Sequence, residues 1–249
     1  MNIGLYQSAA SISALERWQE AVAQNITSSQ TTGYRKRTVE FSAETAGKWN
    51  LNPGTKRSSE NEMRSVFTRA STGISFSGGE TQPTSRDLDI AIRGEGFFEL
   101  KTPDGGRAYT RSGEFQVRAD RTVVTAGNVE LLTDSGNPLV MIPGGEPLTI
   151  NADGTAFQGT TALGRISLMK SGRPETLIPS AGGLFTATAD SQMSKVTNPD
   201  VMQGYLEQSN VKPLREMVDM VLISRAYEAN QKIISTVDQQ MEKTLQALG

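Results

Sequence analysis

The pattern of hydrophobic positions changes twice along the chain, and the first part of it has a helical period. Apolar residues stand 7, 3, 7 and 4 positions apart at Leu5, Ile12, Leu15, Val22 and Ile26. Such spacings place the side chains on one stripe of a helix. The first glycine after the stripe is Gly33, so we expect the helix to end at about Ser28 to Thr31.

The C-terminal segment carries the longest helical pattern. Pro213 stands at its start, where a first-turn proline is tolerated, and no glycine or proline follows before Gly249. The apolar positions recur at a mean of about 3.8 residues, close to the helical repeat; they are Leu214, Val218, Leu222, Ala226, Ala229, Ile233, Val237, Met241, Leu245 and Leu248. A small domain cannot bury so long a face, so we expect partner helices. A hairpin with the N-terminal helix is one source of partners, and helices of other subunits, which we favour, are the second.

Between these segments the pattern changes to period two. In DLDIAIRGEGFFEL, the residues Leu88, Ile90 and Ile92 alternate with the residues between them, and a glycine turn follows. Strand candidates separated by turn signals continue from about residue 76 to residue 200, which is typical of an all-β domain. Residues 33–75 are polar, rich in serine and threonine and weakly patterned, and we expect them to be extended.

These patterns predict an α+β protein. Long N- and C-terminal helices would pair as a coiled-coil-like layer, and an all-β domain of sandwich or barrel type would be inserted between them. The predicted parts are a terminal helical domain of residues 1–30 and 205–249, an extended linking segment of residues 31–75, and a β-rich outer domain of residues 76–204.

The amino-acid composition limits the catalytic and metal-binding groups that the chain can supply. The chain has no cysteine and no histidine, which excludes disulfides, thiolate nucleophiles, imidazole bases and the usual zinc sites. Catalysis by carboxylates, lysine or serine stays open, although an enzyme is less expected, and we expect no cofactor and no metal. The N-terminus lacks the basic and apolar regions of a secretory signal, and no segment approaches a membrane span. If the protein leaves the cytoplasm, we expect it to do so without a cleavable signal peptide, and we expect no membrane insertion.

Three local motifs suggest other functions. Arg35, Lys36 and Arg37 follow Tyr34 and could contact nucleic acid, but the net charge of −2 and the acidic residues that follow favour a solvated segment or ion pairs with a neighbouring subunit. Asp87 and Asp89 could act as paired carboxylates, although a solvated strand face is the simpler interpretation. The spacing S-x-x-K of a serine hydrolase occurs at Ser209 and Lys212 and again at Ser167 and Lys170, without the accompanying K-T-G.

Four stretches of the chain resemble the bacterial flagellar rod and hook protein family. The N-terminal stretch MNIGLYQSAASISALERWQEAVAQNITSSQTTGYRKRTVEF resembles that family's opening signature. DLDIAIRGEGFFEL and AYTRSGEFQV are similar to its central β motifs, and YLEQSNVKPLREMVDMVLISRAYEANQKIISTVDQQME resembles its C-terminal helix signature. Together these matches cover essentially the whole chain in the right order. Within the family, the short length and the PLVMIP to EPLTI segment most resemble the proximal rod subunits; distal rod or hook subunits are the alternatives.

The resemblance implies a non-enzymatic protomer of the flagellar basal-body rod. Such a protomer would leave the cytoplasm through the flagellar type III export apparatus and polymerise in the periplasmic space with copies of itself and other rod proteins. The resulting hollow shaft would transmit torque and let export substrates pass. The apolar positions of both terminal segments would then be packing and assembly residues, whereas Asn25, Gly33, Tyr34 and Arg35 would form a joint between the first helix and the segment that follows it.

Overall fold

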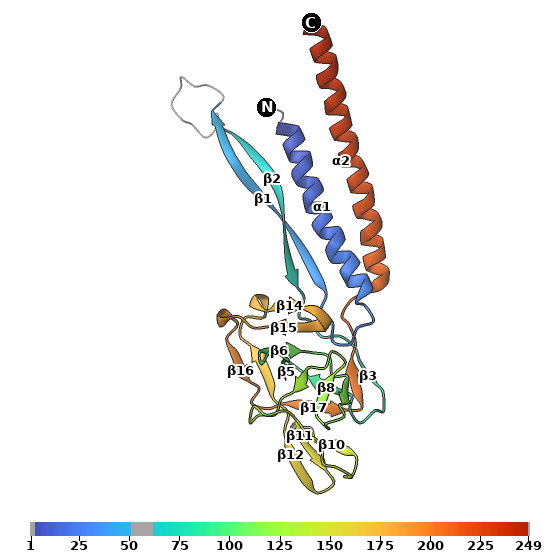
Figure 1. Cartoon of the computed structure of the whole chain (residues 1–249). Helices are drawn as coiled ribbons and strands as arrows, with labels where there is room; N and C mark the ends of the chain where they lie inside the picture. Colours follow the sequence, from blue (N-terminus) through green and yellow to red (C-terminus); the bar gives the residue numbers. More distant parts are fainter. Residues whose placement is uncertain (1–2, 51–61, 249) are drawn as a thin grey trace. The chain divides into compact units, whose positions relative to one another are not determined.

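The computed structural model describes residues 3–50 and 62–248 and divides the chain into two compact units (Figure 1). The first, here called the helix–hairpin unit, comprises residues 1–27, 37–73 and 212–249. The second, the β unit, comprises residues 28–36 and 74–211. Each unit is therefore assembled from segments that lie far apart in the sequence.

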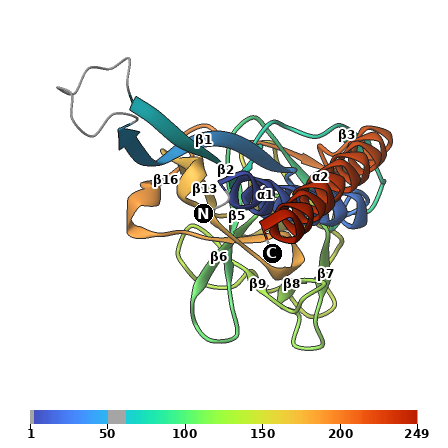
Figure 2. The same ribbon diagram turned by 90° about the horizontal axis from the view of Figure 1, so that it is seen from above.

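The helix–hairpin unit contains the two long helices of the described chain. α1 (Ile3–Thr27) and α2 (Pro213–Leu248) lie side by side and run in opposite directions, as Figures 1 and 2 both show. β1 (Arg37–Asn50) and β2 (Glu62–Ile74) form a two-stranded sheet. β1 packs on α1, where the rings of Trp18 and Phe41 meet edge to face with centroids 5.6 Å apart. The Nη1 of Arg17 donates a hydrogen bond to the carbonyl oxygen of Ala70 at 2.9 Å.

The predicted coiled-coil-like pairing of long terminal helices is wrong. The buried apolar cluster that α1 and α2 share is short: its buried members are Leu15, Val22 and Ile223. A coiled coil requires apolar residues every 3.5 positions, and the positions that we followed along α2 are about 3.8 apart. At about 100° per residue, that stripe turns through roughly 160° around the helix between Leu214 and Leu248. It therefore cannot remain against one straight neighbour, and much of it is exposed.

Residues 31–75, expected as an extended linking segment, contain β1 and β2. Both strands are hard to recognise in the sequence because few of their positions are apolar. In β1 the alternation is limited to Val39 and Phe41, which stand between Thr38, Glu40 and Ser42. A two-stranded sheet is marginal without a surface to pack on. Here α1 supplies that surface, so a contact distant in sequence, rather than local pattern, explains the hairpin.

The β unit consists of short, mostly antiparallel strands. Its central sheet has the order β14-β15-β6-β5-β9-β8-β7, with β13 paired to both β5 and β16. Smaller sheets are β10-β11-β12, β17-β4 and β18-β3. The strands are β3 (Thr81–Pro83), β4 (Ile90–Arg93), β5 (Phe97–Lys101), β6 (Arg107–Thr110), β7 (Phe115–Val117), β8 (Val123–Thr125), β9 (Glu130–Leu131), β10 (Leu148–Ile150), β11 (Thr155–Gln158), β12 (Thr161–Arg165), β13 (Leu168–Ser171), β14 (Ile178–Ser180), β15 (Leu184–Thr186), β16 (Met193–Lys195), β17 (Asp200–Gln203) and β18 (Tyr205–Glu207). Three single-turn 3₁₀ helices lie at Pro174–Thr176, Ala181–Gly183 and Ala189–Ser191.

Strand β5 organises the core of the β unit because both of its faces are buried. Successive side chains of a strand point to opposite faces. Phe98 and Leu100 enter the larger apolar cluster, where Phe98 meets Phe115 edge to face at 5.3 Å, and Phe97 enters a second cluster with Tyr109 and other aromatic residues. A β-rich central part of the chain was predicted, and this part of the fold prediction agrees with the structure.

No helix in the described ranges, 3–50 and 62–248, is long and apolar enough to cross a membrane.

Candidate functional site: an outer apolar face on α2 and a buried joint

One face of α2 is apolar, and the described residues of its unit leave it exposed. Five large side chains lie on it within the first three turns, and the structure exposes all of them: Leu214 (81%), Met217 (51%), Val218 (59%), Val221 (52%) and Leu222 (50%). Their spacing of i, i+3, i+4, i+7 and i+8 defines one helix face. We call these five residues the outer apolar face.

The opposite side of α2 packs on α1. Ile223 is fully buried there, and Met220, Ala226 and Tyr227 are partly buried around it. At about 100° per residue, Ile223 lies on the other side of the helix from Leu214 and Val221. A helix that is apolar on two opposite sides needs partners on both. Within the described residues of the helix–hairpin unit, α2 has a partner on one side.

The predicted packing residues divide between these two environments. Leu15 and Val22 are buried, and Ile12, Ile26, Ala226 and Val237 are half-buried. Leu214, Val218, Leu222, Ala229, Ile233 and Met241 are exposed. The side chains of Leu5 and Leu245 lie outside the described residues. Sequence reasoning missed Ile223, although Met220, Ile223, Tyr227 and Ile234 recur at helical intervals and could have revealed this second face.

Asn25, the first of the predicted joint residues, connects three parts of the helix–hairpin unit. Its side chain is fully buried. Its Oδ1 accepts a hydrogen bond from the backbone N–H of Arg37 at 2.8 Å, and its Nδ2 donates to the carbonyl oxygen of Arg37 at 2.9 Å. The same Nδ2 donates to Glu216 Oε2 in the first turn of α2, also at 2.9 Å. The carboxamide thus ties the last turn of α1 to the first residue of β1 and to the start of α2.

Gly33 lies in the β unit and has a conformation that other residues adopt with strain. Its φ is +66°, and a Cβ built on it would stand 2.3 Å from the backbone nitrogen of Ser112. Its N–H donates to the carbonyl oxygen of Glu207 at 2.7 Å. The close approach and the left-handed backbone both require glycine here. Tyr34 follows in a turn closed by its N–H to Thr31 at 3.3 Å.

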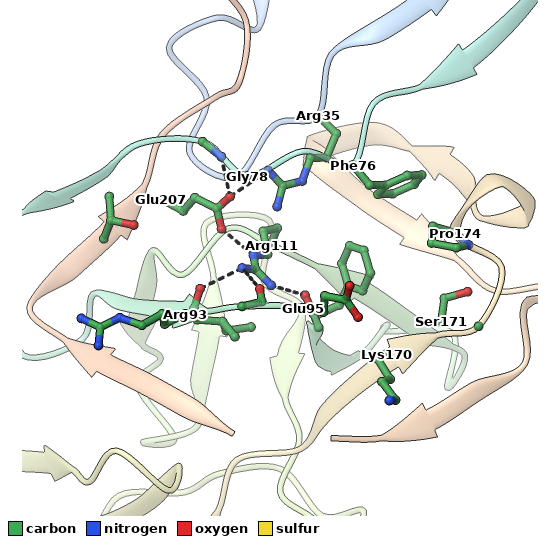
Figure 3. A pocket seen from close by; sticks show the side chains of 17 residues that line it. Arg35, Phe76, Gly78, Arg93, Glu95, Arg111, Lys170, Ser171, Pro174 and Glu207 are labelled. Atoms are coloured by element: carbon green, nitrogen blue, oxygen red, sulfur yellow. Dashed lines mark hydrogen bonds and ion pairs between the residues drawn. The ribbon is translucent and has the colours of Figure 1, made fainter. Parts of the chain in front are cut away.

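Arg35 is buried beside a second arginine, and both bind one glutamate (Figure 3). Arg35 Nη1 lies 2.7 Å from Glu207 Oε1, and Arg111 Nε lies 2.5 Å from Glu207 Oε2. The remaining guanidinium nitrogens of Arg111 donate to the carbonyl oxygens of Ile92, Gly94 and Gly96. Because Arg35 is only 5% exposed, it does not belong to an exposed basic arm of the kind that binds nucleic acid.

The charge of this trio shifts two pKa values. Burial lowers the pKa of Arg35, an effect that the charge of Glu207 opposes without cancelling. Burial by itself would raise the pKa of Glu207. The charges of Arg111 and Arg35 lower this pKa, as do the hydrogen bonds from Arg111 and from the Gly79 N–H. Together they outweigh the effect of burial, so the pKa lies below its ordinary value of 4.5. The carboxylate form of Glu207 is therefore favoured by folding.

Replacing Glu207 by glutamine is expected to remove a pH-dependent part of the stability of the β unit. A depressed carboxyl pKa contributes stability that is present above the unfolded pKa, about 4.5, and is lost as pH falls through the lower folded value. Scanning calorimetry should show the variant less stable by about 3 kcal/mol at neutral pH, with the difference shrinking as pH falls below about 4.5. Glu95→Gln, an exposed acid, should keep the wild-type profile. A difference that stays constant with pH would contradict this role of Glu207.

The paired aspartates and the two S-x-x-K motifs lie in different environments in the structure. Asp87 is exposed but Asp89 is 1% exposed, so the pair does not form one solvated strand face. Ser167 is buried, and its hydroxyl donates to Glu99 Oε2 at 2.5 Å, while Lys170 is exposed. Ser209 Oγ accepts a hydrogen bond from the backbone N–H of Val211. Among the residues with described side chains, no group of three acids stands together as a metal site.

Comparison with known proteins identifies relatives over the whole length. The family described as "Flagellar hook protein FlgE/F/G D1 domain" matches residues 91–158, and the one described as "Flagellar basal body rod FlgEFG protein C-terminal" matches residues 202–247. The chain is 30% identical to the flagellar basal-body rod protein FlgF of Caulobacter vibrioides, over 100% of this chain and 99% of that relative. It is 29% identical to FlgF of Salmonella typhimurium, again over 100% and 99%, and 30% identical to the rod protein FlgG of Borreliella burgdorferi over 94% of each chain.

Proposed function

Because this chain belongs to the flagellar basal-body rod and hook protein family, we propose that it is a structural subunit of the rod that polymerises through its terminal helices. The outer apolar face of α2 is the observation that carries this proposal. Burying a large apolar side chain stabilises an association by about 1.5–3 kcal/mol, and five such side chains are half exposed or more. Neighbouring rod subunits would cover them.

Within the rod, we assign the chain to the proximal part. Alignments with the FlgF relatives cover essentially all of both chains, whereas those with the FlgG relatives from Borreliella burgdorferi and Agrobacterium fabrum leave part of each chain unmatched. A distal rod subunit is the second candidate, because FlgG relatives reach comparable identity.

The remaining parts of the proposal follow from rod membership. The subunit would pass through the flagellar type III export apparatus, act in the periplasmic space, and build with its copies and other rod proteins a hollow shaft that transmits torque and passes export substrates. Its role is mechanical: it turns over no substrate, and it neither binds nucleic acid nor inserts into a membrane.

A site-specific label tests the position in the rod. The chain has no cysteine, so Asp104→Cys, in an exposed turn of the β unit, gives a single thiol for a gold-coupled maleimide. In basal bodies isolated from cells that carry this variant, we expect the gold at the end of the rod next to the cytoplasmic membrane. Gold in the hook-side part of the rod would make the chain a distal subunit, and basal bodies without gold would contradict the structural role.

A further inference from the structure

The β unit contains a cavity of about 580 Å³ that the rod function leaves unexplained (Figure 3). This volume lies within the range of small-ligand sites, about 300–1,000 Å³. Phe76, Phe97 and Pro174 give it an apolar side, and the rings of Phe76 and Phe97 meet edge to face at 6.0 Å. The backbone of residues 94–96 and the arginine–glutamate trio lie on other sides of the cavity.

The charges around the cavity are unbalanced. Four basic side chains line it, Arg35, Arg93, Arg111 and Lys170, against the two acids Glu95 and Glu207. Glu207 is shared by both buried arginines, so the trio by itself keeps one positive charge in excess. The carbonyl oxygens that accept from Arg111 satisfy its hydrogen bonds but bring no negative charge. An uncompensated buried charge is costly, and an anion in the cavity would relieve that cost.

Two of these basic groups also have unused hydrogen-bonding capacity. Arg35 is 5% exposed, and its Nε has no hydrogen-bond partner within the described residues. Lys170 is exposed and makes no ion pair with any acid of the described ranges. Arg93, by contrast, already lies 3.4 Å from Asp200. The Nε of Arg35 is itself buried, so a ligand in the cavity cannot reach it. Lys170, which is exposed and lines the cavity, therefore has the hydrogen-bonding capacity that an anion from outside the chain would use.

We propose that this cavity binds a carboxylate attached to an apolar group. The carboxylate would lie near Lys170, attracted also by the excess positive charge of the two buried arginines, and the apolar part would pack on Phe76 and Phe97. A glutamate in a peptide segment of another subunit and a free aromatic acid offer the same chemistry. The inference stands on the cavity alone and does not depend on assembly into a rod.

Binding to the full-length monomer tests this site. The probes are 3-phenylpropionate, its neutral amide, inorganic phosphate, and the capped tripeptide acetyl-Phe-Glu-Phe-amide with its Gln counterpart, each titrated by calorimetry. Because hydrogen bonds to charged groups are stronger than those between neutral groups, the acid should bind roughly tenfold or more tightly than the amide. Lys170→Ala should weaken binding of the acid about threefold or more, whereas Lys101→Ala, an exposed lysine outside the cavity, should leave it unchanged.

Two outcomes support the proposal. Tighter binding of the Glu tripeptide than of 3-phenylpropionate would assign the site to a protein segment. Binding of the free acid alone would assign it to a small molecule. Equal binding of acid and amide, equal loss in the Lys101 variant, or no binding of either acid at about 10 mM would overturn it. Phosphate binding as tight as that of 3-phenylpropionate would mean an adventitious ion only. Rod assembly is not part of the measurement, so failure here leaves the proposed function untouched.

Discussion

A chain in which Val218 and Leu222 are both replaced by aspartate is expected to fold and yet fail to enter the rod. Both side chains belong to the outer apolar face and are half exposed or more, so the single chain tolerates the change. In an assembled rod each aspartate would be buried without a partner, at a cost of about 3 kcal/mol or more. Two such costs should weaken association by more than about a thousandfold. Basal-body content and swimming motility measure the effect.

The matched control places the same charges on the flank of the helix. Gln231 and Thr244 are exposed polar residues of α2 that lie off the outer apolar face. Gln231→Asp with Thr244→Asp should therefore assemble and swim nearly as the wild type does. If the flank variant fails as completely as the Val218 and Leu222 variant, added negative charge is the cause, and the outer apolar face has no special role.

Replacing Asn25 by alanine should give the largest loss of stability in the helix–hairpin unit. The substitution removes the two hydrogen bonds to the Arg37 backbone and the one to Glu216, all at a fully buried position. Losing buried partners costs about 1–3 kcal/mol per group, so we expect a decrease of about 3 kcal/mol in the free energy of unfolding. Urea unfolding followed by tryptophan fluorescence reports this unit selectively, because Trp18 and Trp49 both belong to it.

Two further variants show whether the hydrogen bonds are responsible. Asn25→Asp keeps the shape but replaces the amide donor with a carboxylate facing Glu216, so it should be at least as destabilising near neutral pH. Gln19→Ala, at an exposed position of the same helix, should change stability by less than about 0.5 kcal/mol. An Asn25→Ala chain as stable as the Gln19 control would show that the joint does not depend on this side chain.

The sequence predicted the elements whose signal is local. The two terminal helices have long apolar patterns, and α1 ends at Thr27, next to the expected end at about Ser28 to Thr31. The family followed from motifs quoted along the whole chain. The packing of α2 did not follow, because positions about 3.8 residues apart wind around the helix. The face centred on Ile223 lies outside that stripe, so the stripe does not predict it.

The chemistry of the predicted joint residues does not follow from the sequence. Asn25, Gly33 and Arg35 were chosen from their position between a helix and an extended segment. Their partners, Glu216, Ser112 and Glu207, lie far along the chain, and no local pattern links them. Arg35 in particular looked solvated beside Lys36 and Arg37. Only the fold brings Glu207 to it and makes one residue of a basic run a buried ion pair.

The most direct test of the central claim is the accessibility of the outer apolar face before and after assembly. Because the chain has no cysteine, Leu222→Cys provides one thiol on that face, and Asp104→Cys provides one on an exposed turn of the β unit for comparison. Labelling with a water-soluble maleimide is measured in the purified monomer and in isolated basal bodies. We predict that Cys at position 222 reacts in the monomer and is protected in the basal body. Equal labelling of position 222 in both states would contradict assembly through α2.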